Sequence, residues 1–226
     1  MKPEIIFEDK YLLVVAKPPG WVVPAQGFEE SIEQWAEEKL SYTPEKVRLG
    51  LPHRLDRLTS GIIVLTKKAQ TLKELSAQFE QRLVEKKYIA IVDGIIQPEE
   101  TRLSHFIRKN NELLKAEVFT TDGPDRKKAE LSYRLLMSGE HSSLIDISLH
   151  TGRYHQIRAQ MSHIGHPVIG DKKYATDSPF YAFYALHAYK LSFTHPKSEE
   201  RLTFSLLPPD RSFWIPYRDI LKNVCC

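Results

Sequence analysis

The chain has 226 residues, of which 42% are hydrophobic and 27% are charged, and its formal net charge is +3. This length can bury a sizeable core, and we expect one domain over residues 1–226, because no linker, repeat or low-complexity tract interrupts the apolar segments. The sequence contains no run of about 18 apolar residues and no basic-then-apolar leader, which predicts a cytoplasmic protein without a membrane span.

The first predicted elements are a strand and a short helix. Residues 11–15 form an apolar run typical of a buried strand, and Lys17-Pro18-Pro19-Gly20 ends it because prolines supply no backbone donor. Ser31 and Gln34 have the spacing of a capping box, so we expect a helix over residues 32–40.

The next three elements surround the middle of the chain. Residues 61–65 are strongly β-prone and predict a strand. Leu72, Leu75, Phe79 and Leu83 recur at helical spacing, which predicts a helix over about residues 70–83. Residues 88–92 predict a further strand.

The remaining elements are mostly strands. Apolar and polar residues alternate over residues 131–135, 145–149 and 202–206, which is the period of half-buried strands. Residues 154–164 carry an apolar helical face, with Arg158 at its start. Strands interleaved with a few helices, without regular βαβ alternation, predict an α+β fold with a mixed, largely antiparallel sheet and flanking helices.

Charge is distributed unevenly along the chain. Residues 1–45 contain 4 Lys and Arg against 9 Asp and Glu, so the remainder contains 28 basic and 20 acidic residues, a net charge of +8. Such an excess fits contact with RNA phosphates, although long basic side chains also cover ordinary solvated faces.

One loop concentrates chemically useful side chains. In His53-Arg54-Leu55-Asp56-Arg57-Leu58-Thr59-Ser60-Gly61, one carboxylate lies between two guanidinium groups, directly before a β-prone run. Asp56 is therefore a candidate nucleophile or general base, and the alternative is a solvated loop with structural ion pairs.

Three further stretches of sequence follow the Asp56 loop in order, and the last two lie close together. Residues 82–94 read RLVEKKYIAIVDG, residues 149–158 read LHTGRYHQIR, and residues 165–171 read GHPVIGD. Together with the Asp56 loop and the Lys17 turn, they resemble the RluA-type family of RNA pseudouridine synthases over most of residues 5–195.

This resemblance implies a fold and a set of catalytic roles. The fold is the pseudouridine synthase fold with a central active-site cleft, and Asp56 is the catalytic nucleophile. Arg158 is the ionic partner of Asp56, and Tyr88 stacks on the target base and is a possible proton acceptor. From the residues alone, core packing on a strand is the stronger interpretation of Tyr88.

The resemblance and the basic residues also imply RNA or substrate contacts. Arg54 would support base flipping, with a structural ion pair as its alternative, and Ile157 would pack in the pocket. We expect His155, Arg153 and Lys86 to contact substrate or RNA as well.

No residue pattern calls for a cofactor or a metal. Nucleotide-binding glycine motifs are absent from the sequence, and His163 and His166 have no second pair of ligands beside them. The only two cysteines, Cys225 and Cys226, are adjacent and are expected in an exposed tail.

The sequence thus predicts an enzyme, an isomerase that converts specific uridines to pseudouridine in structured rRNA or tRNA. RNA is the expected partner, without a membrane or a small-molecule cofactor, and the protein is expected to be a monomer without a separate N-terminal RNA-binding domain. The alternatives are a catalytically inactive RNA-binding module of the same fold, and a nucleoside hydrolase or deaminase.

Overall fold

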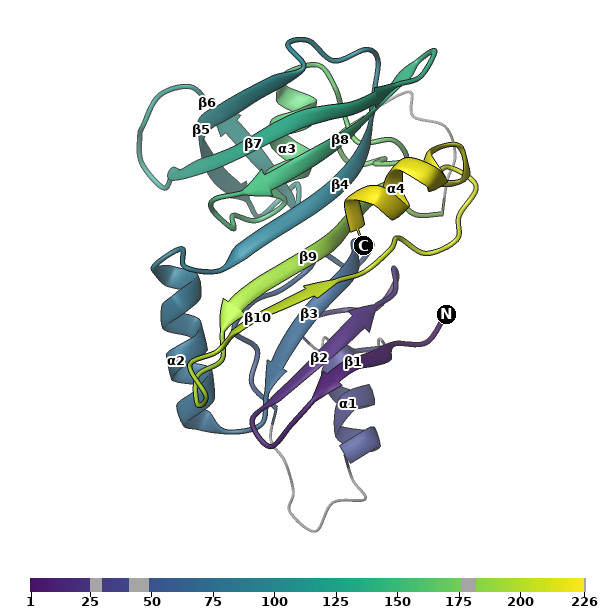
Figure 1. Ribbon diagram of the computed structural model, residues 1–226. Helices are drawn as coiled ribbons and strands as arrows, with labels where there is room; N and C mark the ends of the chain where they lie inside the picture. Colours follow the sequence, from purple (N-terminus) through teal and green to yellow (C-terminus); the bar gives the residue numbers. More distant parts are fainter. Residues whose placement is uncertain (25–29, 41–48, 176–181, 226) are drawn as a thin grey trace. The chain divides into compact units, whose positions relative to one another are not determined.

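The computed structural model describes residues 1–24, 30–40, 49–175 and 182–225. The chain groups into two compact units (Figure 1). The first unit contains residues 1–85, 188–210 and 221–226, and the second contains residues 86–187 and 211–220. Each unit is described by itself.

The first unit is built on strands from both ends of the chain. Its strands follow the order β1, β2, β3, β9, with β10 beside β9. Their bounds are β1 (Glu4–Glu8), β2 (Leu12–Lys17), β3 (Ser60–Thr66), β9 (Leu186–Thr194, of which the unit contains Ala188 onward) and β10 (Arg201–Ser205). The helices α1 (Ile32–Leu40) and α2 (Ala69–Glu80) belong to this unit.

The core of the first unit consists of side chains from these strands and from α2. Its buried members are Leu12, Val14, Ile62, Val64, Leu75, Val84, Leu191 and Phe193. β3 is buried at every position from Ser60 to Thr66, so the loop before it, which contains Asp56, is attached to the most buried strand of the unit.

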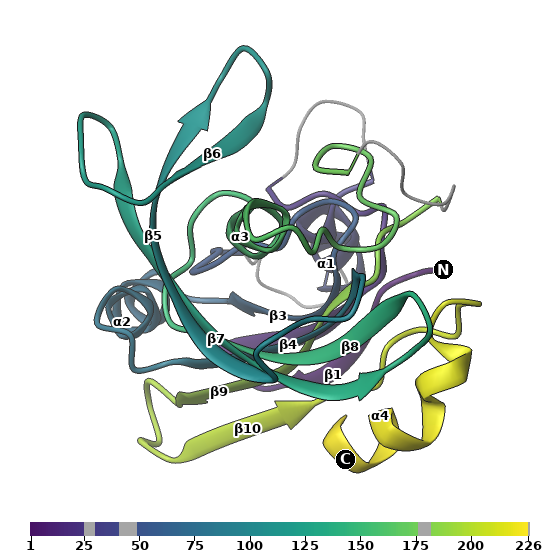
Figure 2. The ribbon, with the colours of Figure 1, turned by 90° about the horizontal axis from the view of Figure 1, so that it is seen from above.

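The second unit has five strands in the order β4, β8, β7, β5, β6. Their bounds are β4 (Glu85–Asp93, of which the unit contains Lys86 onward), β5 (Glu100–Asn110), β6 (Lys115–Phe119), β7 (Lys127–Ser138) and β8 (Ser142–Leu149). All four strand pairings are antiparallel. The helix α3 (Gln156–His163) lies against one face of this sheet (Figure 2), where Ala159 packs on Ile107 and Ala129.

The register of the second sheet places Tyr88 on the face that α3 covers. Tyr88 and Tyr133 are both paired with Ile147, so the three side chains share one face. Ala129 lies on the same face because residues two apart along β7 point the same way, and Ala129 packs against α3.

After β10 the chain forms a 3-10 turn (Ile215–Tyr217) and the helix α4 (Arg218–Cys225). Cys225 is only 3% exposed, so the prediction of an exposed cysteine tail was wrong for this residue. Leu221 is buried on the same helix, and its spacing from Cys225 is one helical turn. Cys226 lies outside the described residues.

The predicted elements are confirmed with shifted ends. Ser31 caps α1 by accepting a hydrogen bond from the backbone N–H of Gln34 at 3.1 Å. The predicted helix over residues 70–83 ends at Glu80, because Arg82 adopts a left-handed φ of 62°, and Leu83 is 55% exposed. The α+β class with a largely antiparallel sheet is confirmed.

Candidate active site

The loop that contains Asp56 is braced by β3 and by the turn after β2. The carbonyl oxygen of Asp56 accepts a hydrogen bond from the Thr59 N–H at 3.0 Å, which closes a turn beside the carboxylate. The Gly20 N–H donates to the Arg57 carbonyl at 2.8 Å, and the Arg57 Nε donates back to the Gly20 carbonyl at 3.2 Å. Leu55 is buried beside the half-buried Asp56. The backbone around Asp56 is therefore held from several sides.

Lys17 is a buried cation under this loop, with an exposed fraction of only 1%. Its Nζ donates to the carbonyl oxygens of Thr59 at 2.7 Å, Arg57 at 2.9 Å and Pro18 at 3.2 Å. Burial lowers the pKa of Lys17 to about 7; the Asp56 carboxylate opposes this shift, and Arg57 adds to it. The sequence reasoning missed Lys17, although a lysine that ends a buried apolar strand was a signal for it.

His53 anchors the start of the loop. Its Nε2 accepts a hydrogen bond from the Val64 N–H at 3.1 Å, and its ring stacks on Phe79 with centroids 4.7 Å apart. A ring nitrogen that accepts from a backbone N–H carries no proton, so this bond gives His53 a structural role in the loop. Arg54, the next residue, is exposed.

Arg158 is buried in the second unit at 5% exposure and makes a two-bond ion pair with Asp171. Its Nε and Nη2 donate to the two Asp171 oxygens at 2.6 and 2.9 Å. The guanidinium carbon also lies 4.5 Å from the ring centre of Tyr184 and 5.1 Å from that of Tyr174. These contacts fix the plane of the guanidinium.

Asp171 is a functional candidate to which the sequence reasoning gave no role, although it closes the GHPVIGD segment. It is 1% exposed, and the Lys173 N–H donates to its Oδ1 at 3.1 Å. A guanidinium has five N–H donors, and the ion pair with Asp171 does not use all of them. The pairing of Arg158 with Asp56 would use the other donors, and it stays a prediction.

The other predicted site residues of the second unit lie around the turn before α3. Lys86 lies close to this turn, because its ammonium is 3.7 Å from the point that a Cβ on Gly152 would occupy. Tyr88 is 7% exposed. Arg153 donates from Nε to the Lys128 carbonyl at 2.9 Å, and Ile157 is 5% exposed.

His155 has an unusual backbone for its residue type. It adopts a left-handed φ of 50°, its Nδ1 lies 3.0 Å from the Tyr174 hydroxyl, and its ring stacks on Tyr154 with centroids 3.8 Å apart. Non-glycine residues pay a conformational cost in this region, so the surrounding contacts hold the turn in place.

The structure therefore describes two groups of predicted residues. Asp56 and Arg54 belong to the first unit, together with Lys17. The second unit contains the other predicted side chains, joined by Asp171; they are Lys86, Tyr88, Arg153, His155, Ile157 and Arg158. A carboxylate on a braced loop suits nucleophilic chemistry, and an aromatic ring on the sheet and a guanidinium on α3 suit contact with a flat base.

Solved structures of known proteins share this fold. The human RNA pseudouridylate synthase domain containing 4 matches 96% of this chain and 92% of its own, with a TM-score of 0.77 and 24% identity. The human RNA pseudouridylate synthase domain containing 1 matches 97% of this chain and 87% of its own, with a TM-score of 0.76 and 24% identity. The fold is thus that of pseudouridylate synthase domains.

Sequence comparison gives the family. The pattern of RNA pseudouridylate synthases matches residues 11–163. Ribosomal large subunit pseudouridine synthase D of Zymomonas mobilis is 36% identical over 91% of this chain, and ribosomal large subunit pseudouridine synthase C of Vibrio cholerae is 36% identical over 88% of it. The chain spans 69% and 63% of the lengths of these two relatives. The chain belongs to the RNA pseudouridylate synthase family, whose members are isomerases that act on RNA.

Proposed function

We propose that this protein isomerises uridine to pseudouridine in large-subunit ribosomal RNA, with Asp56 as the nucleophile. The observation that carries the proposal is the family match over residues 11–163, which includes Asp56, Tyr88 and Arg158. The names of the two bacterial relatives favour ribosomal RNA over transfer RNA as the first substrate to test.

The reaction is balanced without an oxidant or a reductant. The bond from the ribose C1′ to N1 of uracil breaks, the ring turns, a bond from C1′ to C5 forms, C5 loses its proton, and N1 takes up a proton. Asp56 would open this sequence by adding to the uracil ring or by attacking C1′. An isomerisation of this kind has no need of a redox cofactor.

The other roles belong to the same proposal. Arg158 would pair with the Asp56 carboxylate, because a buried carboxylate without a partner takes up a proton instead. Tyr88 would stack on the everted base in a central cleft, with its hydroxyl near the proton that C5 must lose. Ile157 would line the same pocket.

RNA would be held by exposed and half-exposed basic and polar side chains. We assign phosphate or base contacts to Arg54, Arg153, His155 and Lys86, with Arg54 stacking where the base has left the helix. A cytoplasmic monomer with a single catalytic domain completes the proposal. None of the helices in the described part of the chain is long and apolar enough to cross a membrane.

The experiment is a tritium-release assay on RNA labelled at uridine C5, because formation of the C1′–C5 bond releases that hydrogen. We expect release from large-subunit ribosomal RNA with the unaltered protein and none with Asp56→Ala. Transfer RNA and small-subunit ribosomal RNA are the comparison substrates.

Mass spectrometry separates the rival activities, since isomerisation leaves the RNA mass unchanged, whereas deamination or hydrolysis changes it. RNA binding without tritium release from any of these RNAs would contradict the proposal and favour an inactive binding module.

A further inference from the structure

We propose that Gln156 is a positioning residue for the reaction: its side-chain amide fixes the turn at residues 151–155 and thereby the part of α3 that carries Arg158. This inference rests on the proposed function. Gln156 would touch no reacting atom and would act through the placement of the Arg158 side chain.

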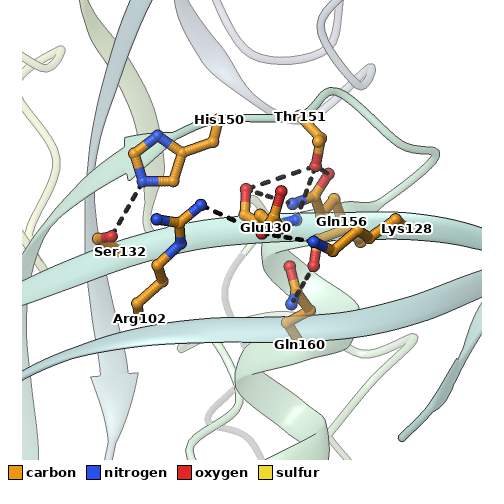
Figure 3. A network of polar contacts seen from close by, with 9 residues as sticks. Arg102, Lys128, Glu130, Ser132, His150, Thr151, Gln156 and Gln160 are labelled. Carbon is orange, nitrogen blue, oxygen red and sulfur yellow. Dashed lines mark hydrogen bonds and ion pairs between the residues drawn. The ribbon is translucent and has the colours of Figure 1, made fainter. Parts of the chain in front are cut away.

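The Gln156 amide makes three hydrogen bonds and is 3% exposed. Its Oε1 accepts hydrogen bonds from the Thr151 hydroxyl at 2.7 Å and from the Arg153 N–H at 3.0 Å. Its Nε2 donates to the Glu130 carbonyl on β7 at 3.1 Å (Figure 3). One side chain therefore joins the turn to the sheet and to the first residue of α3.

The orientation of this amide is determined by its neighbours. The Arg153 N–H can only donate and the Glu130 carbonyl can only accept, so Oε1 must face the first and Nε2 the second. The Glu130 N–H donates to the Thr151 hydroxyl at 2.8 Å, which leaves the hydroxyl proton for Gln156. Glu130, Thr151 and Gln156 thus form a closed ring of hydrogen bonds, in which the Thr151 hydroxyl accepts from the Glu130 N–H and donates to Gln156.

The Gln156 amide holds the turn before α3 rather than the N–H groups of the helix itself. His155 occupies the N-cap position of α3, but its side chain makes no capping hydrogen bond. The N–H groups at a helix start need partners, and side-chain oxygens usually provide them. Here Gln156 binds the Arg153 N–H just before the helix, so the direction in which α3 leaves the turn depends on this amide.

Arg158 is two residues after Gln156, and its guanidinium is held at the far end by Asp171 at 2.6 and 2.9 Å. A shift at the start of α3 would therefore move the backbone of Arg158 relative to its guanidinium, which Asp171 holds in place. Displacements of about 1 Å at a positioned group can cost on the order of a hundredfold in rate.

Gln160 provides a matched control on the same helix face, one turn later. It is fully buried, and its Nε2 donates to the carbonyl of Ala129, the residue before Glu130 on β7, at 3.3 Å. Its Nε2 also lies 2.9 Å from Nδ1 of His105, and its Oε1 has no hydrogen-bond partner among the described residues. Gln160 ties α3 to the sheet as Gln156 does, without holding the turn.

The test compares Gln156→Ala with Gln160→Ala by thermal unfolding, RNA dissociation constant and single-turnover rate at saturating RNA. We expect both variants to lower the unfolding temperature. Gln156→Ala should lower the rate by about tenfold to a hundredfold with the RNA dissociation constant within about threefold of the parent, whereas Gln160→Ala should keep the rate within about threefold.

A second variant, Gln156→Glu, tests the same inference if Gln156→Ala fails to fold. When protonated, the introduced carboxyl group has the shape and the hydrogen-bonding pattern of the amide. When ionised, it would face the Glu130 carbonyl without a proton to donate. Burial raises the pKa of such a carboxyl, so the rate of this variant relative to the parent should recover as pH falls from about 8 to about 5.5.

Two results would overturn the inference: equal rate losses in Gln156→Ala and Gln160→Ala, or a rate ratio for Gln156→Glu that is flat with pH. An unaltered protein that forms no pseudouridine would instead contradict the proposed function, so the two failures are distinguishable.

Discussion

At the scale of single residues, the lowered pKa of Lys17 predicts that the stability of the fold depends on pH. Burial lowers its pKa to about 7, whereas an unfolded lysine keeps a pKa near the ordinary value of 10.5. Between these two values the unfolded chain binds more protons than the folded chain. The contribution of Lys17 to the free energy of unfolding therefore rises as pH increases from about 7 to about 10.5.

Lys17→Met tests this. The change removes the ammonium from the carbonyls of Pro18, Arg57 and Thr59, and we expect a loss of about 1–3 kcal/mol from the lost hydrogen bonds. Urea unfolding of both proteins at several pH values should show that the parent gains stability relative to the variant above about pH 7. A difference that is constant or shrinks with rising pH would contradict the assignment.

Residue types predicted part of this chemistry. Asp56 and Arg158 became candidates because each lies within an ordered set of motifs, and their catalytic roles stay predictions. Lys17 and Asp171 were given no role, because two of the carbonyls that Lys17 binds lie 40 and 42 residues away and the guanidinium that Asp171 binds lies on a different element, 13 residues away. Such partners are set by tertiary packing, which local sequence patterns do not describe.

At the scale of elements, Gly61 on β3 packs closely against the backbone of Ala188 on β9. Gly61 has φ +129°, and an added Cβ would lie 2.3 Å from the Ala188 carbonyl oxygen and 2.6 Å from its nitrogen. Backbone atoms cannot move away as a flexible side chain can. The loop that contains Asp56 thus ends at a position where only glycine fits.

Gly61→Ala should lower the free energy of unfolding by more than about 3 kcal/mol, by combining backbone strain with overpacking. Gly165→Ala is the matched control, since Gly165 has φ +86° with nothing within 4 Å of an added Cβ. It isolates the strain, and we expect about 1 kcal/mol in the same denaturant measurement. Equal losses in the two variants would argue against close packing at Gly61.

Periodicity located the elements better than it located their ends. The α2 prediction extended three residues too far, because Leu83 continued the apolar spacing while the backbone turned at Arg82. Residues 97–128, for which periodicity predicts no element, contain β5, β6 and the start of β7. Their charged residues weaken the alternation that signals a strand.

At the scale of the whole molecule, charge makes a prediction about RNA affinity. The net charge of +8 over residues 46–226 would release counterions from RNA phosphates. We expect the dissociation constant for structured RNA to rise at least about tenfold between about 50 and 200 mM salt. An affinity that does not change over this range would exclude phosphate contact as the basis of binding.

The α+β class and the family were predictable because they depend on strand periodicity and on motifs in a fixed order. The single domain, the monomeric state and the cleft stay predictions, since they depend on packing between segments far apart in the chain. The RNA target depends on surface shape, for which the sequence contains no local pattern.

The most direct test of the central claim is the single-turnover rate of Asp56→Asn at saturating RNA, measured beside its RNA dissociation constant. The amide keeps the shape of the carboxylate but loses its nucleophilicity. We predict a rate at least about a thousandfold below the parent, with the dissociation constant within about threefold. Pseudouridine formation by this variant at a rate close to that of the parent would contradict the account.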